Sequence, residues 1–482
     1  MQIHSEKKNL VLLLSPFAYK SNKNYNVNVD STISRHSGAK TKNGAFYPTG
    51  LGYISSILKQ AGFPVRLMDP GPQSSSVAQV LAEAEKANFI IMPISAPRYE
   101  ETTSFLKNYR NKIRIGISNF ASIYAEKLLK EGVCDIICHG EVEQTCSELV
   151  QAYYDSGKPE LSKINGISFI DQNGTIIKTA SRPLTDKLDS IPFPDREGFD
   201  QNLYNDVAFF GAPTAYILTA RGCPFKCTFC STHLTYNYKV NYRSPENVVA
   251  EVESVIRNHG IKNFFFIDDT FTLVPSRVKK ICDLIMEKKL DIQWACLGRL
   301  DVLNDEMLVK MKAAGCIEVR MGAESGNDSI LKNTKKDLTV TQIEKGINLM
   351  KKHKMRYTLF FMIGNQGETK ETVLQTIRFA KKLNPIFASF NISTPLPGSE
   401  LFERYKESFQ FNDIQTFNTV SSNFSVCDLS PKQLRHLLLY AYFSYYFRPS
   451  FFMKLFSELI QRPKDTGKII YFLFQQARAV VS

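Results

Sequence analysis

The chain has 482 residues, of which 43% are hydrophobic, and it carries a formal net charge of +13. This length predicts two to four domains with enough apolar residues for a sizeable core. No run of about eighteen apolar residues and no signal-peptide form is present, so we expect a cytoplasmic, reduced protein in which clustered cysteines bind metal. The basic residues are scattered, which predicts a solvated basic surface and no nucleic-acid partner.

Residues 1–156 are expected to form the first domain, in which short apolar strands and helices alternate. The expected strands span 10–14, 65–69, 89–94, 113–117 and 134–138. The expected helices span 48–62, 77–87, 99–110, 121–131 and 141–154. Such alternation predicts an α/β domain with a doubly wound, Rossmann- or flavodoxin-like parallel sheet that binds ligands at the carboxyl ends of its strands.

A linker is expected over residues 157–213. Within it, 167–170 and 175–179 read as a β-hairpin, because Asn173-Gly174 is a strong turn signal. The proline-rich stretch Ile191-Pro-Phe-Pro-Asp195 is expected to be a stiff connection to the next domain.

Three closely spaced cysteines follow an apolar strand expected over 216–220. Cys223, Cys227 and Cys230 have the spacing C-x3-C-x2-C and come after a turn marked by Gly222 and Pro224. Three thiolates on one loop suit a [4Fe–4S] cluster and leave one of its four irons open. A zinc site with His233 as fourth ligand, or three unrelated core cysteines, are the alternatives.

Residues 214–410 again alternate strands and helices. Further strands are expected at 263–269, 292–299, 317–324, 357–364 and 387–395, with helices such as 244–259, 304–314 and 341–353 between them. Six βα units predict a partial (β/α)6 TIM-type barrel with its site at the carboxyl ends of the strands.

Polar residues and a glycine turn close several of these barrel strands, and together they can hold a zwitterionic ligand. Each one taken singly is equally well explained as a solvated strand end or a helix cap. The set comprises Asp268, Asp269, Arg299, Glu324, Ser325, Gly364 and Glu368.

Residues 411–482 are expected to form a helical C-terminal cap. The stretch 440–456 is crowded with Tyr and Phe and is broken at Arg448-Pro449. The favoured interpretation is a cap that packs on the barrel. The alternative is an interfacial surface for a lipid-like substrate, a peripheral membrane contact with Lys454, Arg462 and Lys464 near anionic headgroups.

The cysteine motif, with Phe229 as the aromatic residue before its last cysteine, resembles that of radical S-adenosylmethionine (SAM) enzymes. The resemblance implies that the open iron chelates SAM and that the cluster donates an electron, which cleaves SAM to methionine and a 5′-deoxyadenosyl radical. It also implies that Phe229 packs near the adenine. Asp268 and Asp269 match positions that contact the SAM amino group, and Glu324 matches a ribose contact.

Two further segments match the same family. Residues 362–368, which include Gly364 and Glu368, resemble its motif near the adenine, with Asn365-Gln366 as a departure from the usual pattern. Thr394-Pro-Leu-Pro-Gly-Ser399 resembles its turn after the sixth strand.

The first domain resembles the cobalamin-binding domain that precedes one large class of these enzymes. The matching residues are Pro48 and Gly50 before the first long helix, Asp69 after the second strand, and Gly140 and Glu141 after the fifth. Where relatives have paired glycines after the fourth strand, this chain has Gly116-Ile-Ser-Asn119. The cobalt-ligating Asp-x-His-x-x-Gly motif is absent, which implies no protein ligand from below. A flavodoxin-like domain that binds no cobalamin is the alternative.

The resemblance, which covers about residues 9–410, implies a cobalamin-dependent C-methyltransferase that acts on a small-molecule or lipid-like substrate. It also implies an external electron donor such as flavodoxin or ferredoxin. The alternatives are a rearrangement, cyclisation or oxidation, or a non-catalytic cobalamin or metal sensor. Methylthiolation of transfer RNA is disfavoured, because enzymes of that kind carry three cluster cysteines in the N-terminal domain and this chain has no cysteine before Cys134.

Overall fold

A computed structural model of the protein describes residues 9–17, 40–41, 44–206, 209, 212–415, 417 and 423–461. The described chain forms two compact units, each with its own sheet. The first unit contains the described residues up to Thr41, residues 45–204 and the short segment 234–237, and the second contains Gly44, residues 205–233 and the chain from 238 onward. Both units are α/β, as the sequence predicts, and none of the described helices is long and apolar enough to cross a membrane.

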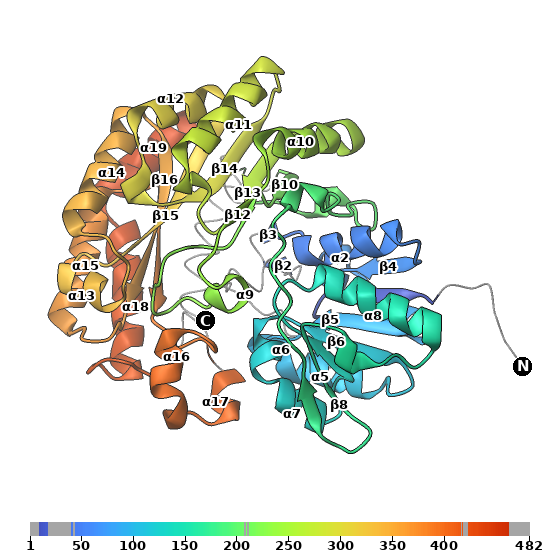
Figure 1. Ribbon diagram of the computed structural model, residues 1–482. Helices are drawn as coiled ribbons and strands as arrows, with labels where there is room; N and C mark the ends of the chain where they lie inside the picture. Colours follow the sequence, from blue (N-terminus) through green and yellow to red (C-terminus); the bar gives the residue numbers. More distant parts are fainter. Residues whose placement is uncertain are drawn as a thin grey trace, which may run out of the picture. The chain divides into compact units, whose positions relative to one another are not determined.

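The first unit is built on a seven-stranded sheet in the order β4-β1-β5-β6-β7-β8-β9 (Figure 1). The first five strands are parallel, and β8 and β9 are antiparallel additions at one edge. All five residues of β5 are buried, as expected for a strand whose sheet is covered on both faces. The strands are β1 (Val11–Leu14), β4 (Val65–Met68), β5 (Phe89–Pro93), β6 (Ile113–Ile117), β7 (Ile136–Cys138), β8 (Ile167–Ile170) and β9 (Ile176–Lys178).

The helices of the first unit follow from this strand order. Because the chain changes direction at β1 and its crossovers are right-handed, the helices are expected on both faces of the sheet. Two of them, α2 and α8, pack against each other. The helices are α2 (Thr49–Gln60), α3 (Pro70–Gln73), α4 (Val77–Lys86), α5 (Tyr99–Lys107), α6 (Asn119–Ile123), α7 (Ala125–Lys130) and α8 (Glu143–Ser156).

One helix prediction needs correction. The single helix expected over 121–131 begins earlier and is divided at Tyr124 into α6 and α7. It begins earlier because the Ser118 hydroxyl accepts a hydrogen bond from the Ala121 N–H and so caps α6.

The segment expected as a linker packs on the first unit as far as Tyr204. Its hairpin, β8 and β9, extends the sheet, and Asp171 receives the N–H groups of Asn173 and Thr175 in the turn. The proline-rich stretch is fixed by Asp195, whose carboxylate accepts a 2.5 Å hydrogen bond from Ser55. Residues 167–204 therefore belong physically to the first unit.

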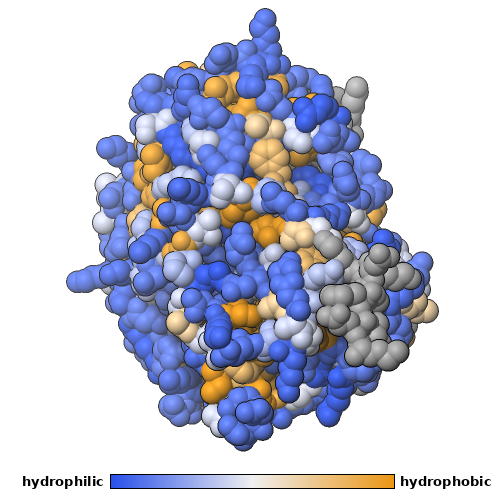
Figure 2. Space-filling view, turned by 45° about the vertical axis from the view of Figure 1, so that its right-hand side comes forward, coloured by the Kyte–Doolittle hydropathy of each residue, from blue (hydrophilic) through white to orange (hydrophobic). Residues whose placement is uncertain are grey.

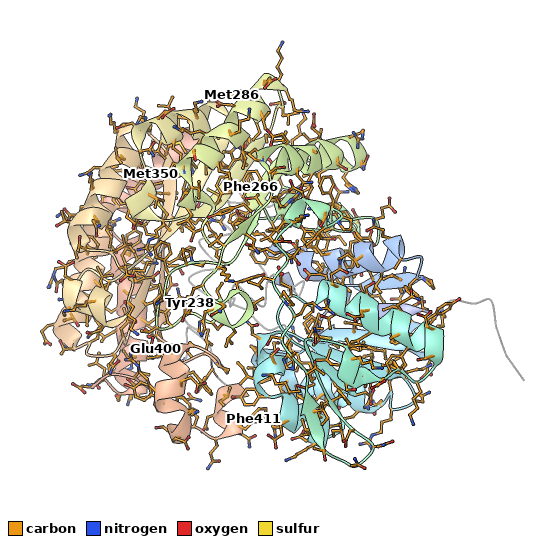
Figure 3. The ribbon with its side chains drawn as sticks, in the orientation of Figure 1. Tyr238, Phe266, Met286, Met350, Glu400 and Phe411 are labelled. Atoms are coloured by element: carbon orange, nitrogen blue, oxygen red, sulfur yellow. The ribbon has the colours of Figure 1, made fainter. Side chains whose placement is uncertain are left out.

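The second unit contains a six-stranded parallel sheet whose strands follow one another in chain order. Its core includes Phe266, which stacks on Phe271 and meets Trp294 edge-on (Figure 3). The strands are β10 (Thr214–Ile217), β13 (Asn263–Phe266), β14 (Gln293–Gly298), β15 (Cys316–Glu324), β16 (Arg356–Ile363) and β17 (Phe387–Ile392). Two short ladders pair β11 (Ala220–Arg221) with β12 (Asn241–Tyr242), and β2 (Lys40–Thr41) with β3 (Gly44–Ala45).

Helices connect these strands and continue after the last one. Ser244 caps α10 and Pro245 is its first residue, as the sequence predicts. The helices are α10 (Pro245–His259), α11 (Pro275–Glu287), α12 (Asp305–Ala313), α13 (Asp328–Asn333), α14 (Val340–Lys352), α15 (Lys370–Leu383), α16 (Glu400–Tyr405), α17 (Phe411–Gln415), α18 (Pro431–Tyr446) and α19 (Pro449–Gln461). The short helix α9 (His233–Tyr236) falls almost wholly in the segment 234–237 that belongs to the first unit.

The tyrosines of α18 cover the edge of the sheet at β17. The Tyr442 hydroxyl accepts from the Phe390 N–H at 3.2 Å and donates to its carbonyl at 3.0 Å. Tyr446 makes the same pair of bonds with Ala388. An uncovered edge strand is a template for pairing with other chains, and these side chains occupy that edge. This contact agrees with the cap that the sequence favours.

Candidate active site

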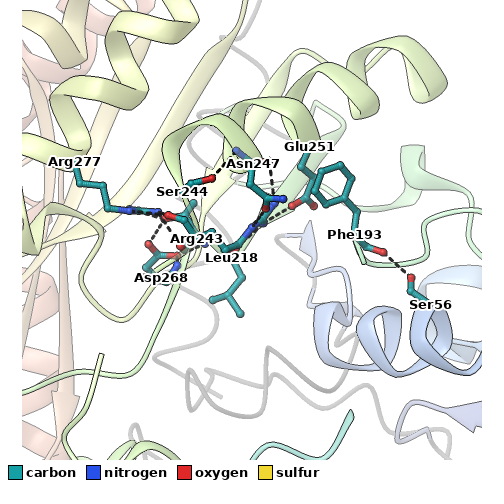
Figure 4. A network of polar contacts seen from close by, with 11 residues as sticks. Ser56, Phe193, Leu218, Arg243, Ser244, Asn247, Glu251, Asp268 and Arg277 are labelled. Atoms are coloured by element: carbon teal, nitrogen blue, oxygen red, sulfur yellow. Dashed lines mark hydrogen bonds and ion pairs between the residues drawn. The ribbon is translucent and has the colours of Figure 1, made fainter. Parts of the chain in front are cut away.

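The cysteine loop is fixed at its base by Asp268, which follows β13. The Asp268 carboxylate accepts the backbone N–H groups of Thr219 at 2.6 Å and Ala220 at 3.0 Å, as well as the Thr219 hydroxyl. Arg277 donates to the Thr219 carbonyl at 2.8 Å, and it lies in the same network of polar contacts as Asp268 (Figure 4). Burial raises the pKa of Asp268, and Arg277 and the Thr219 donors oppose the rise. The carboxylate thus holds the strand that leads into the cysteine loop.

The three cysteines are half-buried and lie near one another. Burial raises the pKa of Cys223, Cys227 and Cys230, the last to about 11, and each thiol lies within electrostatic range of the next. The loop is pinned at Thr228, whose N–H donates to the Thr334 carbonyl at 3.0 Å and whose carbonyl accepts the Leu401 N–H at 2.8 Å. The thiols are therefore gathered on a loop that other segments hold in place.

The arrangement of these thiols differs from a site for a single ion. Among the described residues, no group of three or more His, Cys, Asp or Glu side chains is close enough to hold one metal ion. In a [4Fe–4S] cube each thiolate binds a different iron, so its ligands lie farther apart than those of one zinc ion. His233, the alternative zinc ligand, stacks on Tyr238 with 5.1 Å between ring centroids. The donor set therefore fits a cluster better than a zinc ion.

A buried ion pair lies beside the cysteine loop. Lys336 donates to the Glu324 carboxylate at 2.9 Å, and both side chains are about nine-tenths buried. Burial by itself lowers the pKa of Lys336, but Glu324 and Cys227 raise it above its usual value. Glu324 has a positive φ of 59°, and a side chain at Gly322 would collide with its carboxylate. Backbone strain of this kind costs free energy and persists only where the surroundings impose it.

Sequence reasoning identified Glu324 but missed Lys336. Lys335 and Lys336 are neighbours in a polar stretch, and nothing in their pattern shows which one points inward. In the structure Lys335 forms a surface pair with Glu400, whereas Lys336 forms the buried pair with Glu324.

Arg299, which follows β14, joins the cysteine loop to the segment after α13. Its guanidinium lies 3.6 Å from the centre of the Phe225 ring. It also donates to the carbonyls of Lys336 at 2.7 Å and Asp337 at 2.8 Å. Its Nε pairs with Asp301. Arg299 thus positions Lys336 relative to the loop through contacts within the chain.

The other predicted SAM residues fall into two groups. Ser325 and Glu368 are fully buried, and their partners belong to the chain: Ser325 lies 3.1 Å from the Thr376 hydroxyl, and Glu368 accepts the Asn365 N–H at 2.8 Å. Burial raises the pKa of Glu368 to about 7. Gly364 has a positive φ of 79° in the same turn. In contrast, Phe229 and Asp269 are half-buried, and Asp269 is close enough to Cys223 and Cys230 to raise their pKa.

A second candidate site lies at the carboxyl ends of the parallel strands in the first unit. Asp69 follows β4 and is fully buried. Its Oδ2 accepts the Tyr204 hydroxyl at 3.1 Å, whereas its Oδ1 accepts no hydrogen bond from the described residues. Burial raises the pKa of Asp69 well above its usual value, against the opposing effect of hydrogen bonds from Tyr204 and Ser15. A protonated Asp69 can donate a hydrogen bond, which a carboxylate cannot.

The neighbouring strand ends carry further polar groups. His139 follows β7, and burial lowers its pKa to about 4, so the ring is neutral at pH 7. Ser118 follows β6 with a positive φ of 121°, at the place where relatives have paired glycines. The sequence shows Ser118 in place of a glycine there, but it does not predict that this serine has a strained backbone.

The remaining predicted cobalamin residues have separate positions. Pro48 precedes the first residue of α2 and Gly50 lies in its first turn. Gly140 is exposed with a positive φ of 71°, and an added Cβ there would meet nothing within 4 Å. Glu141 accepts the Thr185 N–H at 2.6 Å and so ties the later segment to the sheet.

Comparison with known proteins decides the family. The sequence model of the radical SAM superfamily matches residues 217–380, which include the cysteine loop. An uncharacterized methyltransferase of Pyrococcus horikoshii is 31% identical over 419 residues, which are 84% of this chain and 89% of that protein. The chain belongs to the radical SAM superfamily. The resemblance drawn from the cysteine motif is thus confirmed, and so is the expectation of an enzyme.

Two other similarities extend over most of this radical SAM protein. The anaerobic magnesium-protoporphyrin IX monomethyl ester cyclase of Rubrivivax gelatinosus is 28% identical and matches 80% of this chain and 71% of the cyclase. The structure of the radical SAM methyltransferase TsrM from Kitasatospora setae, with cobalamin and a [4Fe–4S] cluster bound, has a TM-score of 0.65 at 17% identity. That match covers 83% of this chain and 75% of TsrM, and it shows that the two proteins share a fold.

Proposed function

We propose that the protein is a cobalamin-dependent radical SAM methyltransferase that methylates a carbon atom of a small-molecule substrate. The observation that carries this proposal is the extent of the match to a named methyltransferase, which covers 84% of the chain and so includes most of both units. The shared fold with TsrM, which holds cobalamin and a [4Fe–4S] cluster, supports the same assignment.

The strand orders support a finer description of the architecture. In the first unit the parallel strands β1, β4, β5, β6 and β7 have the spatial order 2-1-3-4-5, which supports a doubly wound, flavodoxin-like domain. In the second unit six parallel strands in chain order support a partial (β/α)6 barrel closed by the C-terminal helices.

In the second unit we propose that some residues contact the cluster or SAM and that others hold those residues in place. Cys223, Cys227 and Cys230 hold the cluster. Asp269 and the Glu324–Lys336 pair present opposite charges to the charged groups of SAM, and Phe229 packs near its adenine. When bound, the cluster and SAM supply the electron transfer and the radical that begin the reaction.

The supporting residues act through the chain. Asp268 fixes the base of the cysteine loop, and Arg299 fixes Lys336 against that loop. Ser325 and Glu368 hold the turns after β15 and β16. An external donor such as flavodoxin or ferredoxin completes the proposed system.

In the first unit we assign the carboxyl ends of the strands to cobalamin. Burial raises the pKa of Asp69 and lowers that of His139, so it favours the neutral form of both, and one oxygen of Asp69 has no hydrogen-bond partner among the described residues. Neutral hydrogen-bonding groups suit the neutral amides at the rim of a corrin. Pro48, Gly50, Gly140 and Glu141 lie on loops and helix starts that follow the same strands.

The first experiment is anaerobic purification from cells supplied with cobalamin, followed by iron and cobalt analysis and an absorption spectrum. We expect a cluster together with about one cobalamin per chain. SAM and a strong reductant are then added with extracts that contain candidate methyl acceptors. A methyltransferase forms S-adenosylhomocysteine as well as 5′-deoxyadenosine. A cluster without cobalamin would contradict the proposal.

A second function, radical cyclisation, is favoured by the match to the cyclase over 80% of the chain. The same assay separates the two reactions. A cyclase forms 5′-deoxyadenosine in step with product and forms no S-adenosylhomocysteine, because no methyl group leaves SAM.

A further inference from the structure

Helix α18 has two unlike faces. Tyr442, Tyr445 and Tyr446 point to the sheet, where their hydroxyls bond to the backbone at β17 and to the Pro385 carbonyl. The opposite face exposes Tyr440, Phe443 and Phe447. A surface helix normally turns polar side chains to solvent, so the exposed aromatic face is unusual.

Helix α19 continues the apolar surface. Together, the exposed apolar side chains of the two helices define what we term the C-terminal patch, and six of the seven are between 53% and 67% exposed. Outside the patch, Val309 is the one large hydrophobic residue of the described chain with more than half its surface exposed. The patch comprises Tyr440, Phe443, Phe447, Phe452, Met453, Phe456 and Ile460.

The contrast with the rest of the surface indicates a binding function. On the face drawn in Figure 2, apolar residues form separate areas between hydrophilic ones, which is the ordinary pattern. The C-terminal patch differs from that pattern, because several exposed aromatic residues lie within twenty-one consecutive positions. Such a concentration of exposed apolar surface indicates an interaction site.

Charge identifies the partner. From residue 431 to 468 the sequence contains seven Lys or Arg and two acidic residues. Of these, Lys432 and Arg435 are exposed on α18 itself, whereas Arg448 bonds to the Lys381 carbonyl and the Asn384 side chain. Apolar aromatic side chains with a basic margin are the features of an interfacial helix on anionic lipid. A symmetric contact between two copies would bring the same basic residues together, which is electrostatically unfavourable.

We propose that the C-terminal patch docks the protein on the surface of an anionic lipid bilayer. The Phe and Met side chains enter the boundary between headgroups and acyl chains, and the basic residues lie over the headgroup charges. The contact is peripheral, because none of the described helices is long and apolar enough to span a bilayer. The inference stands on the patch and its charge, and it does not depend on the proposed methyltransferase activity.

Co-sedimentation of the full chain with vesicles tests this proposal. One set of vesicles is pure phosphatidylcholine and the other contains about 30% phosphatidylglycerol. We expect the partition coefficient to be at least about tenfold higher for the anionic vesicles and to fall when salt screens the headgroups.

Two double variants address the patch directly: Phe443→Ser with Phe447→Ser, and Phe452→Ser with Phe456→Ser. Each is expected to lower binding to anionic vesicles by about tenfold or more, because two inserted aromatic rings are lost. Val309→Ser is the matched control, since it removes an equally exposed apolar side chain from α12, and its binding should stay at the wild-type level. Thermal unfolding checks that all variants are folded.

Sedimentation velocity without lipid tests the other possible occupant. A wild-type dimer that the patch variants convert to a monomer would overturn the proposal in favour of a second copy. Binding that is absent, that is equal for both vesicle types, or that persists in both double variants would also overturn it.

Discussion

The carboxyl ends of the two parallel sheets are built with opposite electrostatics. In the first unit, burial raises the pKa of Asp69 well above its usual value and lowers that of His139 to about 4, so burial disfavours the charged form of both groups. In the second unit, Glu324 and Lys336 form a buried pair of opposite charges beside the cysteine loop. The same kind of strand arrangement therefore offers hydrogen bonds in one unit and charges in the other.

The difference in electrostatics indicates which kind of ligand the carboxyl ends of the strands can bind in each unit. A buried charge is tolerated only with a partner, and Lys336 is that partner for Glu324. The groups that donate to Asp69 are the uncharged hydroxyls of Tyr204 and Ser15, so no cation offsets the cost of a buried charge there, and burial raises the pKa of Asp69. The first edge therefore suits a ligand with neutral polar groups, and the second suits a zwitterion next to a metal cluster.

The largest expected effect is the loss of the cluster and of activity when a cysteine of the C-x3-C-x2-C loop is replaced, in contrast to a cysteine elsewhere in the second unit. We predict that Cys227→Ala abolishes the cluster and with it the formation of 5′-deoxyadenosine, because a cluster ligand is lost. Iron content, the absorption spectrum and chromatography of the products measure this. Cys427→Ala, which removes another half-buried thiol of the same unit, should retain both iron and activity. An intact cluster in the Cys227 variant would refute the assignment.

The next prediction concerns a substitution that breaks the Glu324–Lys336 ion pair of the second unit. Lys336→Met leaves Glu324 buried without its cation, and we expect the free energy of unfolding to fall by about 3–5 kcal/mol. Chemical denaturation measures the change, and SAM binding should weaken in the same variant. Lys335→Met is the matched control, because Lys335 is part of a surface pair worth about 0–1 kcal/mol. Equal effects of the two substitutions would show that the pair has no special role.

A matched pair of amide substitutions compares the two edges directly. At pH 7 we expect Glu324→Gln to lower the free energy of unfolding by about 1–3 kcal/mol, because Lys336 loses its counter-charge. Asp69→Asn should not lower it, because the group that it replaces is already neutral. Denaturation of both variants under one set of conditions gives the comparison. A strongly destabilised Asp69→Asn protein would mean that Asp69 is ionised.

The last predicted effect is the pH dependence of stability that Asp69 of the first unit causes. The folded state raises the pKa of Asp69, so it binds this proton more tightly than the unfolded chain does. This tighter proton binding contributes to the free energy of unfolding. The contribution is complete below a pH of about 4, and it decreases by up to about 1.4 kcal/mol per pH unit as the pH rises toward the pKa of Asp69 in the folded state. Asp69→Asn removes this slope, so its stability relative to the wild type should increase between about pH 4 and pH 7. A constant difference across that range would contradict the buried, neutral carboxyl.

The sequence predicted most elements of the fold because their signals are local. Buried strands such as β5 are continuous apolar runs, and helix starts such as Ser244-Pro245 carry their own caps. The earlier start of helix α6, at Asn119, was not predicted, because the cap at Ser118 depends on how the chain leaves β6.

For the site, the sequence supplied the residue types but not all their roles. The cysteine spacing pointed to a cluster, and the acids at the strand ends pointed to a charged ligand. Asp268 and Ser325 are expected as ligand contacts, which stays a prediction, and in the structure their polar groups also bond to Thr219 and Thr376. A strand-end acid that binds a ligand and one that holds a loop have the same sequence pattern, so sequence does not separate them.

The sequence by itself thus determined the family, the cysteine loop and the two α/β units, because spacing and periodicity act over short stretches of chain. Tertiary structure alone decided which lysine faces Glu324, that burial raises the pKa of Asp69, and which side of α18 covers β17. Each of these depends on residues distant in sequence that burial brings together. Burial also sets the protonation state and the pairing of charged groups, and neither can be read from the order of the residues.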